Sequence, residues 1–464
     1  MGPQVTPLDQ LLARAGISWA GSQVPLAITS VAGDSRGVEP GALFVNLCRD
    51  PGRRGGQLRA AVARGATAGA GEGEAPAGLD VPWIRVTDAS RSLGELLWQH
   101  HRADLEGMRF YGVTGTDGKT SSCHYLRSAL AAAGRKAATI GTIGCFGPGG
   151  RRETGMTTPS TPDLYRMLVS LAQEGVTDAV VEMSSHGLDQ RRAWPLPLEL
   201  GMWTCLTHDH LDYHKEMEAY GRAKARLFEQ VRPGGWVSLN HDDAWVRKFG
   251  AAALSPAPAF GKVWYGFEEG AEVRGRVVSV TTEGMVLEIS WDGRRELWPL
   301  PFVAAYQAAN ALGVAAGLLR LGVAPQDILQ GLQAVGTVAG RMERVPSPLP
   351  FAVFVDYSHT PGGLTAALTA ARRLTRGKLS VVFGCGGNRD RTKRAPMGEI
   401  AFRLADRAYL TSDNPRQEPP AEIIREVLSG AKDPSRMRAL PDRKEAIAVA
   451  IAEAGEGDVV LLCG

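Results

Sequence analysis

The sequence predicts an α/β fold in which buried parallel strands alternate with amphipathic helices. The central part of the chain has apolar strands, separated by helical segments, at residues 179–183, 200–206 and 235–239. The C-terminal part repeats this alternation, with strands expected at 352–356, 379–384, 407–411 and 458–462 and helices at 362–374 and 421–430. A glycine-rich turn between an expected strand at 105–111 and helix at 124–133 is the third sign of this fold class.

The first hundred residues follow a less regular pattern. A strand is expected at residues 41–47 and a helix at 58–64. Glycine and proline in 50–56 and 70–77 predict loops that break this segment into small units. Changes of pattern near residues 105 and 336 then predict three domains, which are 1–105, 106–336 and 337–464.

The composition is that of a soluble globular protein. Of 464 residues, 44% are hydrophobic and 22% are charged, and the net charge of +3 does not indicate a nucleic-acid surface. No apolar run approaches the roughly 20 residues that a membrane span needs, and the N-terminus lacks the layout of a signal peptide. Six cysteines without a C-x-x-C pair predict reduced thiols in the cytoplasm, with neither a zinc site nor a disulfide framework.

The segment Gly115-Thr-Asp-Gly-Lys-Thr-Ser121 is typical of a loop that binds nucleotide phosphates. Its glycines let backbone N–H groups point inward, and the start of the following helix adds a positive dipole. Lys119 would neutralise the outer phosphates, and Thr120 would ligate magnesium. The pattern is G-T-x-G-K-T, because Val113 stands where the strict motif has its first glycine, and it favours a narrower group of ATP users. The alternative is a glycine-rich turn that binds no ligand.

Polar side chains follow two of the expected strands in the central domain. Glu182, at the end of the first, is suited to hold a metal ion, and residues 184–192 add the hydroxyls and arginines that bind anions. Residues 207–214, after the next strand, are rich in His and Asp. Each cluster alone would also fit a polar helix cap or a solvated face. Their succession behind one phosphate loop favours a shared active site.

Eight segments resemble, in order, the motifs of the Mur ligase family, closest to its UDP-N-acetylmuramoyl-tripeptide synthetases. They are GVTGTDGKT, TTPST, EMSSHGLDQRR, LTHDHLDYHKEMEAYGRAKARLF, GRMERV, VDYSHTPGGL, VFGCGGNRDRTKR and TSDNPRQEP. The resemblance is specific from residue 105 onward, and weaker before it, in DSRGVEPGALFVNL. It implies a small α/β UDP-binding domain, a central P-loop ATPase with a parallel sheet, and a C-terminal Rossmann-like domain that brings an amino acid. It also implies a cytoplasmic monomer that makes peptidoglycan precursors.

The chemistry implied by the resemblance is ATP-driven amide formation. The terminal carboxylate of UDP-N-acetylmuramoyl-L-alanyl-D-glutamate would attack the γ-phosphate of ATP, and the amine of meso-diaminopimelate would displace phosphate from the acyl phosphate. Lys119, Glu182, His210 and Lys224 are the implied catalytic residues. Thr120 and Glu182 would hold one magnesium ion, and His210 with carbamylated Lys224 the other. The alternative for Lys224 is a surface lysine paired to Glu218 or Asp212.

The resemblance also implies the binding residues for two substrates. For the UDP-muramoyl dipeptide it nominates Gly33, Ser35, Thr157, Thr158, Ser184, Gln190 and Arg192. For ATP it nominates Gly115, Thr116, Asp117, Gly118, Lys119, Thr120 and Ser121, with Asn310, Arg341 and Asp356. His359 lies in the same motif as Asp356 but receives no role.

The third substrate depends on the segment Asp413-Asn414-Pro415-Arg416, which resembles the signature of diaminopimelate-adding members. Arg416 would pair with the distal carboxylate, which lysine lacks, and Arg389 would be the second arginine facing the amino acid. Gly464 matches the first glycine of a family segment that also contacts the amino acid. In the alternative, Arg416 caps a helix or pairs with Glu418.

Several positions depart from the family pattern. Ala304 and Gln307 stand where glycine and asparagine are usual, Asp117 replaces an asparagine, and the loop after Leu47 differs. The sequence stops at Gly464, before the rest of the family's G-K-G-H-E segment, so we expect a trimmed sequence or an altered amino-acid pocket. The alternative functions are a ligase for L-lysine, another amino acid or a folylpolyglutamate-type substrate, and a non-catalytic paralogue.

Overall fold

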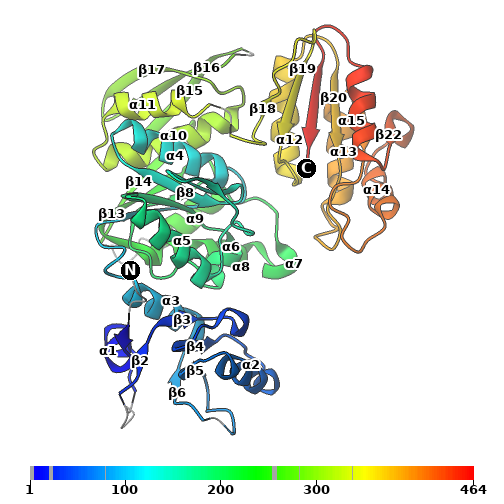
Figure 1. Cartoon of the computed structure of the whole chain (residues 1–464). Helices are drawn as coiled ribbons and strands as arrows, with labels where there is room; N and C mark the ends of the chain where they lie inside the picture. Colours follow the sequence, from blue (N-terminus) through cyan, green and yellow to red (C-terminus); the bar gives the residue numbers. More distant parts are fainter. Residues whose placement is uncertain (1–4, 20–24, 79, 253–258, 282, 337) are drawn as a thin grey trace. The chain divides into compact units, whose positions relative to one another are not determined.

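The computed structural model describes residues 5–19, 25–78, 80–252, 259–281, 283–336 and 338–464 (Figure 1). Contacts group the chain into two compact units. The first comprises Met1–Gly112, Arg135–Gly201 and Arg226–Gly235, and the second Val113–Gly134, Met202–Ala225 and Trp236–Gly464. The three-domain division stays a prediction, and Thr337, at which its third domain begins, lies outside the described residues. None of the described helices is long and apolar enough to cross a membrane.

A parallel sheet organises the N-terminal part of the first unit. Its order is β3 (Ser30–Ala32), β4 (Ala42–Asn46), β5 (Ala68–Glu72), β6 (Trp83–Val86). The strand expected at 41–47 is confirmed, but the loop predicted at 50–56 is wrong. Helix α2 (Pro51–Ala63) runs through it, because the Asp50 carboxylate caps the Gly52 N–H at 2.9 Å and proline suits the first helical turn. The loop predicted at 70–77 begins late, because β5 continues to Glu72.

Among the described residues, the largest sheet has eleven strands. Its order is β10 (Gly150–Arg152), β9 (Gly144–Gly147), β8 (Ala137–Gly141), β11 (Asp178–Glu182), β7 (Arg109–Thr114), β12 (Leu198–Trp203), β13 (Val231–Asn240), β14 (Gly261–Gly266), β15 (Val273–Val280), β16 (Met285–Trp291), β17 (Arg294–Leu300). Strands β8 and β11 pair in parallel, as do β13 and β14, whereas β15, β16 and β17 form an antiparallel meander. Near the N-terminus, strands β1 (Thr6–Pro7) and β2 (Ala27–Ile28) pair with each other in a separate sheet.

The strand and helix around the phosphate loop are displaced from their predicted bounds. Strand β7 begins at Arg109 rather than at residue 105 and continues to Thr114, and α4 (Lys119–Ala132) begins five residues earlier than predicted. Gly112, Val113 and Thr114 are buried in the sheet, so these residues extend the strand although the motif suggests a loop. The turn that reverses the chain is therefore only residues 115–118.

The other helices connect the strands. They are α1 (Leu8–Arg14), α3 (Ala89–His100), α5 (Thr161–Gln173), α6 (Ser185–Asp189), α7 (Leu211–His214), α8 (Met217–Ala225), α9 (Ala244–Ala252), α10 (Ala305–Arg320) and α11 (Pro325–Ala334), followed by α12 (Pro361–Leu374), α13 (Arg394–Leu404), α14 (Pro420–Leu428) and α15 (Arg443–Ala452).

The C-terminal part of the second unit is a sheet covered on both faces. Its order is β18 (Glu343–Arg344), β19 (Ala352–Asp356), β23 (Val459–Cys463), β20 (Leu379–Phe383), β21 (Arg407–Leu410), β22 (Met437–Ala439). From β19 to β22 the neighbours pair in parallel, and Figure 1 shows the connecting helices beside them. Side chains alternate between faces: Phe354 and Val381 pack in one cluster with α12, α13 and α14, and Val353 and Val382 pack in another with α15. The predicted Rossmann-like arrangement is confirmed.

Helix α11 packs tightly against α4, the helix that follows the phosphate loop. A β-carbon at Gly331 of α11 would lie 2.3 Å from Cα of Ala129 in α4. The Ser128 hydroxyl donates to the Gly331 carbonyl at 2.7 Å. The two helix backbones are therefore in direct contact, and only glycine permits that distance.

We predict that Gly331→Ala destabilises the protein by about 1–3 kcal/mol, because the added methyl group must push α11 away from α4. The matched control is Gly56→Ala in α2, where no atom lies within 4 Å of the added carbon. This control should be neutral or stabilising, since alanine favours helix. Thermal unfolding of both variants checks the prediction, and equal stabilities would contradict the close contact.

Candidate active site

The phosphate loop packs its backbone against side chains that come from elsewhere in the second unit. Gly115 has φ +149° and Gly118 has φ +83°. A β-carbon at Gly115 would lie 1.8 Å from the Thr204 hydroxyl oxygen, and one at Gly118 would lie 2.4 Å from Asn310 Oδ1. The Thr204 hydroxyl donates to the Asp117 carbonyl at 2.5 Å. The loop is thus a shaped cradle that admits no side chain at either glycine.

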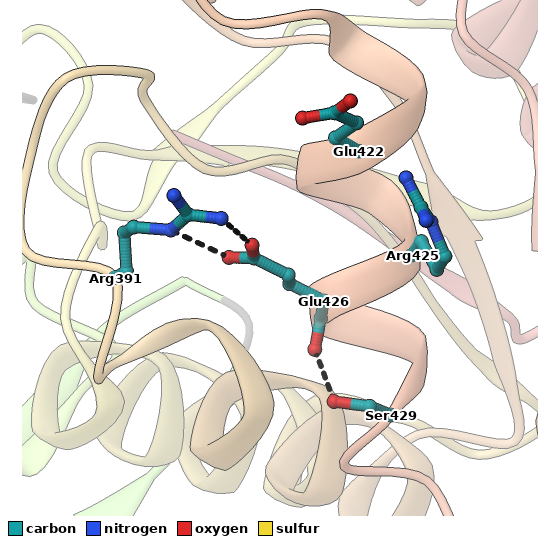
Figure 2. Close-up of a pocket in the computed structure, with 5 residues that line it drawn as sticks. All are labelled: Arg391, Glu422, Arg425, Glu426 and Ser429. Atoms are coloured by element: carbon teal, nitrogen blue, oxygen red, sulfur yellow. Dashed lines mark hydrogen bonds and ion pairs between the residues drawn. The ribbon is translucent and has the colours of Figure 1, made fainter.

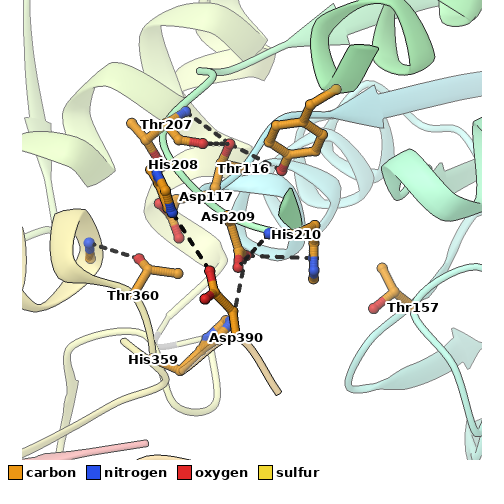
Figure 3. Close-up of polar contacts among 12 residues, drawn as sticks. Thr116, Asp117, Thr157, Thr207, His208, Asp209, His210, His359, Thr360 and Asp390 are labelled. Atoms are coloured by element: carbon orange, nitrogen blue, oxygen red, sulfur yellow. Dashed lines mark hydrogen bonds and ion pairs between the residues drawn. The ribbon is translucent and has the colours of Figure 1, made fainter. Parts of the chain in front are cut away.

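The remaining loop residues are also held in place. The Thr116 hydroxyl accepts from Thr207 N–H at 3.0 Å, a contact that Figure 3 shows, and it lies 3.2 Å from the Tyr220 hydroxyl. Lys119 Nζ donates to the carbonyls of Gly115 at 3.0 Å and Thr116 at 2.8 Å. Thr120 and Ser121 are buried in the first turn of α4.

Lys224 of α8 reaches the same loop from the interior of the protein. Its side chain is 1% exposed, and Nζ donates to the Gly115 carbonyl at 2.6 Å. Burial lowers the pKa of Lys224 well below its ordinary value, and the neighbouring Lys119 ammonium lowers that pKa further. The surface-lysine alternative is therefore wrong. A buried amine with a depressed pKa is neutral more often, and hence more nucleophilic, than an ordinary lysine.

Arg341 and Asp356, two residues predicted to bind ATP, come from the C-terminal part of the second unit. The Arg341 guanidinium donates to the Thr120 hydroxyl at 3.0 Å. Asp356 accepts from Met342 N–H and from the Tyr306 hydroxyl, both at 2.8 Å. Gln307, at a position that departs from the family pattern, donates to the Arg341 carbonyl at 3.1 Å and accepts from Ala304 N–H at 3.0 Å. This glutamine therefore links the start of α10 to the segment that carries Arg341.

His210 lies in a small charged cluster, which Figure 3 shows. His210 has φ +55° and lies next to Asp209, whose buried carboxylate is 3.4 Å from His210 Nε2 and 4.0 Å from His359 Nε2. Burial alone would raise the pKa of Asp209, but the charges of His210, His359 and Lys393 together lower it. The sequence analysis did not predict Asp209 as a site residue, although Asp209 directly precedes His210 in the segment 207–214. It also gave His359 no role.

Glu182 belongs to the first unit. It is 1% exposed at the end of β11, and its carboxylate accepts from Thr142 N–H at 2.8 Å and from the Thr142 hydroxyl at 3.1 Å. The Thr142 hydroxyl also lies 3.0 Å from that of Thr157. Sequence reasoning missed Thr142. Its position directly after β8, at the same sheet edge as Glu182, was the available signal.

Four of the residues predicted for the dipeptide form one network near Glu182. The Thr158 hydroxyl donates to the Glu182 carbonyl at 2.8 Å and lies 3.1 Å from the Ser184 hydroxyl. Arg192 donates to the Thr158 carbonyl at 2.9 Å and to Gln190 Oε1 at 2.7 Å. Gly33 and Ser35 lie elsewhere in this unit: Gly33 packs on Leu93, and Ser35 begins a short 3₁₀ helix.

The residues predicted to bind the amino acid follow the ends of β20 and β21. Arg416 has φ +51°, and its guanidinium donates to the Gly387 carbonyl at 2.8 Å. Gly387 N–H in turn donates to the Asn414 carbonyl at 2.9 Å, and a β-carbon at Gly387 would lie 1.9 Å from the Pro415 carbonyl oxygen. Arg389 is exposed on the neighbouring loop, and Asp413 lies beside Gly464. The Glu418 carboxylate bonds to Arg394. Glu418 is thus engaged by Arg394 rather than by Arg416, which contradicts the ion-pair form of the alternative, whereas its helix-cap form stays a prediction.

Comparison with known proteins identifies the family. Residues 113–318 match the Mur ligase middle domain, and residues 340–464 match the Mur ligase glutamate ligase domain. The chain is 37% identical to a UDP-N-acetylmuramoyl-L-alanyl-D-glutamate--2,6-diaminopimelate ligase of Gloeobacter violaceus, covering 98% of this chain and 92% of the relative. It is 40% identical to one of Alkalilimnicola ehrlichii, covering 94% and 89%.

A solved structure agrees with these matches. A structure of a UDP-N-acetylmuramoyl-L-alanyl-D-glutamate--2,6-diaminopimelate ligase superposes with a TM-score of 0.73 at 29% identity, over 98% of this chain and 93% of that one. Fold, sequence and motif order therefore agree along nearly the whole chain, and the chain belongs to the Mur ligase family.

Proposed function

We propose that this chain is an ATP-dependent ligase that joins meso-2,6-diaminopimelate to UDP-N-acetylmuramoyl-L-alanyl-D-glutamate in peptidoglycan precursor synthesis. The observation that carries the proposal is the convergence of Lys119 and the buried Lys224 on the Gly115 carbonyl, in a loop that excludes side chains. The names of the relatives supply the other two substrates. We further propose that the protein is cytoplasmic, which the free cysteines of the described residues support, and that it acts as a monomer.

The loop fits ATP because its glycines and the start of α4 form the turn that a phosphate-binding loop requires. Glycines at 115 and 118 let amide groups approach phosphate oxygens closely, and the start of α4 adds its dipole. Lys119 would exchange its two carbonyl partners for the outer phosphates. Arg341, bonded to the Thr120 hydroxyl, places a second cation at the same helix end.

Magnesium prefers hard oxygen donors such as the Thr120 hydroxyl in the second unit and the Glu182 carboxylate in the first, each of which we propose as a ligand in its own surroundings. When bound, it would neutralise phosphate charge during transfer. Among the described residues, no group of three or more His, Cys, Asp and Glu side chains is arranged to hold a metal. His210 and Lys224 would serve a second ion. An amine is a poor ligand for magnesium, but attack of neutral Nζ on carbon dioxide, with loss of a proton, gives a carbamate with two oxygens.

The protein's remaining task is to position the reactants and exclude water. Thr158, Ser184, Gln190 and Arg192 offer the donors that hold the dipeptide portion of the substrate. The substrate carboxylate oxygen then bonds to the γ-phosphorus as ADP leaves. The amine nitrogen next bonds to the acyl carbon, releasing phosphate and losing a proton.

Arg416 favours diaminopimelate over lysine as the incoming amino acid. Its backbone is held in the left-handed region and its guanidinium lies on the Gly387 carbonyl, so the side chain is preorganised at a strand end. A guanidinium presents paired donors that match a carboxylate. Diaminopimelate carries a carboxylate at its far end, and lysine carries none.

We predict that Lys224→Ala lowers the ligase rate by about 10²-fold or more, because it removes a group at the site of charge development. Short carboxylates such as acetate should partly restore the rate if the lysine is carbamylated. The control is Lys248→Ala, an exposed lysine paired with Glu218. Phosphate release measures both variants, and carbon-13 NMR with labelled bicarbonate detects the carbamate. A wild-type protein without that signal would contradict carbamylation.

We also predict that Arg416→Ala raises the KM for diaminopimelate by about 10²-fold, because a charge-assisted pair is lost, while the KM for ATP is unchanged. Arg425→Ala, which removes an arginine of α14 exposed in the same part of the chain, is the control. Phosphate release with diaminopimelate or L-lysine measures the effect. A wild-type protein that uses both amino acids equally would argue for the lysine-adding alternative.

A further inference from the structure

The buried charge of Arg394 has no part in the chemistry above. Arg394 is the first residue of α13, and its side chain is 0% exposed. Burying a guanidinium is costly unless several acceptors surround it. A positive charge at a helix N-terminus also opposes the helix dipole. The surroundings of Arg394 must therefore compensate for both costs.

Two carboxylates and a carbonyl surround this guanidinium. Nη1 and Nη2 donate to the two oxygens of Glu418 at 2.9 Å and 3.0 Å, which is a bidentate pair. Nη1 also donates to Glu426 at 2.8 Å, and Nη2 to the Gly386 carbonyl at 3.2 Å. Arg394 thus joins the loop before α13 to the loop before α14. These loops carry Arg389 and Arg416.

Glu418 extends the link from Arg394 to both loops. Its carboxylate accepts from Asn388 N–H, and the Asn388 side chain accepts from Gln417 N–H at 3.0 Å. Asn388 and Arg416 both have positive φ, 50° and 51°, a region that is uncommon for residues other than glycine, although asparagine enters it more readily than arginine. The pair Arg394–Glu418 is the charged centre of these contacts.

The outer side of the pair is closed by a third ion pair. Glu426, which binds Arg394 on one side, also accepts from the Arg391 guanidinium. Figure 2 shows Arg391 reaching Glu426. Both residues line a pocket of about 360 Å³, together with Glu422, Arg425 and Ser429. Water therefore meets Arg391 and Glu426, while Arg394 lies beneath them.

The charges of the pair persist at neutral pH. Burial alone would lower the pKa of Arg394, but the hydrogen bonds that it donates to Glu418 and Glu426 raise that pKa. The Arg394 guanidinium and the Asn388 N–H lower the pKa of Glu418 to about 2. An intact ion pair is therefore present throughout the range in which the enzyme would work.

We propose that Arg394 and Glu418 are positioning residues that set the specificity for an amino acid with a second carboxylate, because together they hold the loops of Arg389 and Arg416 at a fixed separation. This inference rests on the proposed function. Neither residue needs to touch the substrate. A loop shift of about 1 Å is enough to cost a misaligned site roughly 10²-fold.

The test compares Arg394→Lys and Glu418→Gln with Glu422→Gln in the full-length protein. Lysine keeps the charge but not the fork, glutamine keeps the shape but not the charge, and Glu422 is a carboxylate of the same region outside the Arg394 contacts. Both test variants should raise the KM for diaminopimelate about 10–100-fold, leave the KM values for ATP and the dipeptide within twofold, and narrow the preference over L-lysine. Hydrogen exchange should quicken in residues 386–391 and 413–418.

Three results would distinguish the positioning role from a general folding role and from a failure of the proposed function. Unchanged diaminopimelate KM and unchanged exchange in both loops would overturn the inference. A parallel rise of all three KM values with a lower Tm would also overturn it, because that pattern belongs to a general folding role. A wild-type protein inactive with diaminopimelate, but with faster loop exchange in both variants, would refute the proposed function and support the positioning role itself.

Discussion

The site in the second unit depends on a backbone that packs directly against side chains. At Gly115 the space of a β-carbon is filled by Thr204, and at Gly118 it is filled by Asn310. These residues stand at the end of β12 and inside α10, so the phosphate loop is shaped by parts of the chain far from it in sequence. With the loop fixed, its Gly115 carbonyl becomes an acceptor for both Lys119 and Lys224.

The same constraint explains the electrostatics of the site. Two amines approach one carbonyl, and burial together with the charge of Lys119 depresses the pKa of Lys224. The carbamylation proposed above would turn this poor metal ligand into a good one. In the first unit, the Glu182 carboxylate is held by donors from Thr142.

The loops that carry Arg389 and Arg416 are held in a similar way by different groups. A glycine, Gly387, lets two loops meet backbone to backbone, and a buried charge, Arg394, holds them through Glu418. In both places glycine creates the close approach and a buried cation organises the polar groups around it. Sites of this kind are precise because their positions are set by packing rather than by flexible side chains.

The sequence by itself determined the α/β class, the strand at Ala352–Asp356 and the order of the motifs, because periodicity and glycine spacing are local properties. It did not reveal that α2 runs through the glycines of residues 51–56, or that Gly331 is obligatory where Gly56 is not. Thr142, Asp209 and the partnership of Glu418 with Arg394 were equally hidden. Only the tertiary structure decided these features, because each depends on a contact or a burial that the fold creates, whereas a motif records just the spacing along the chain.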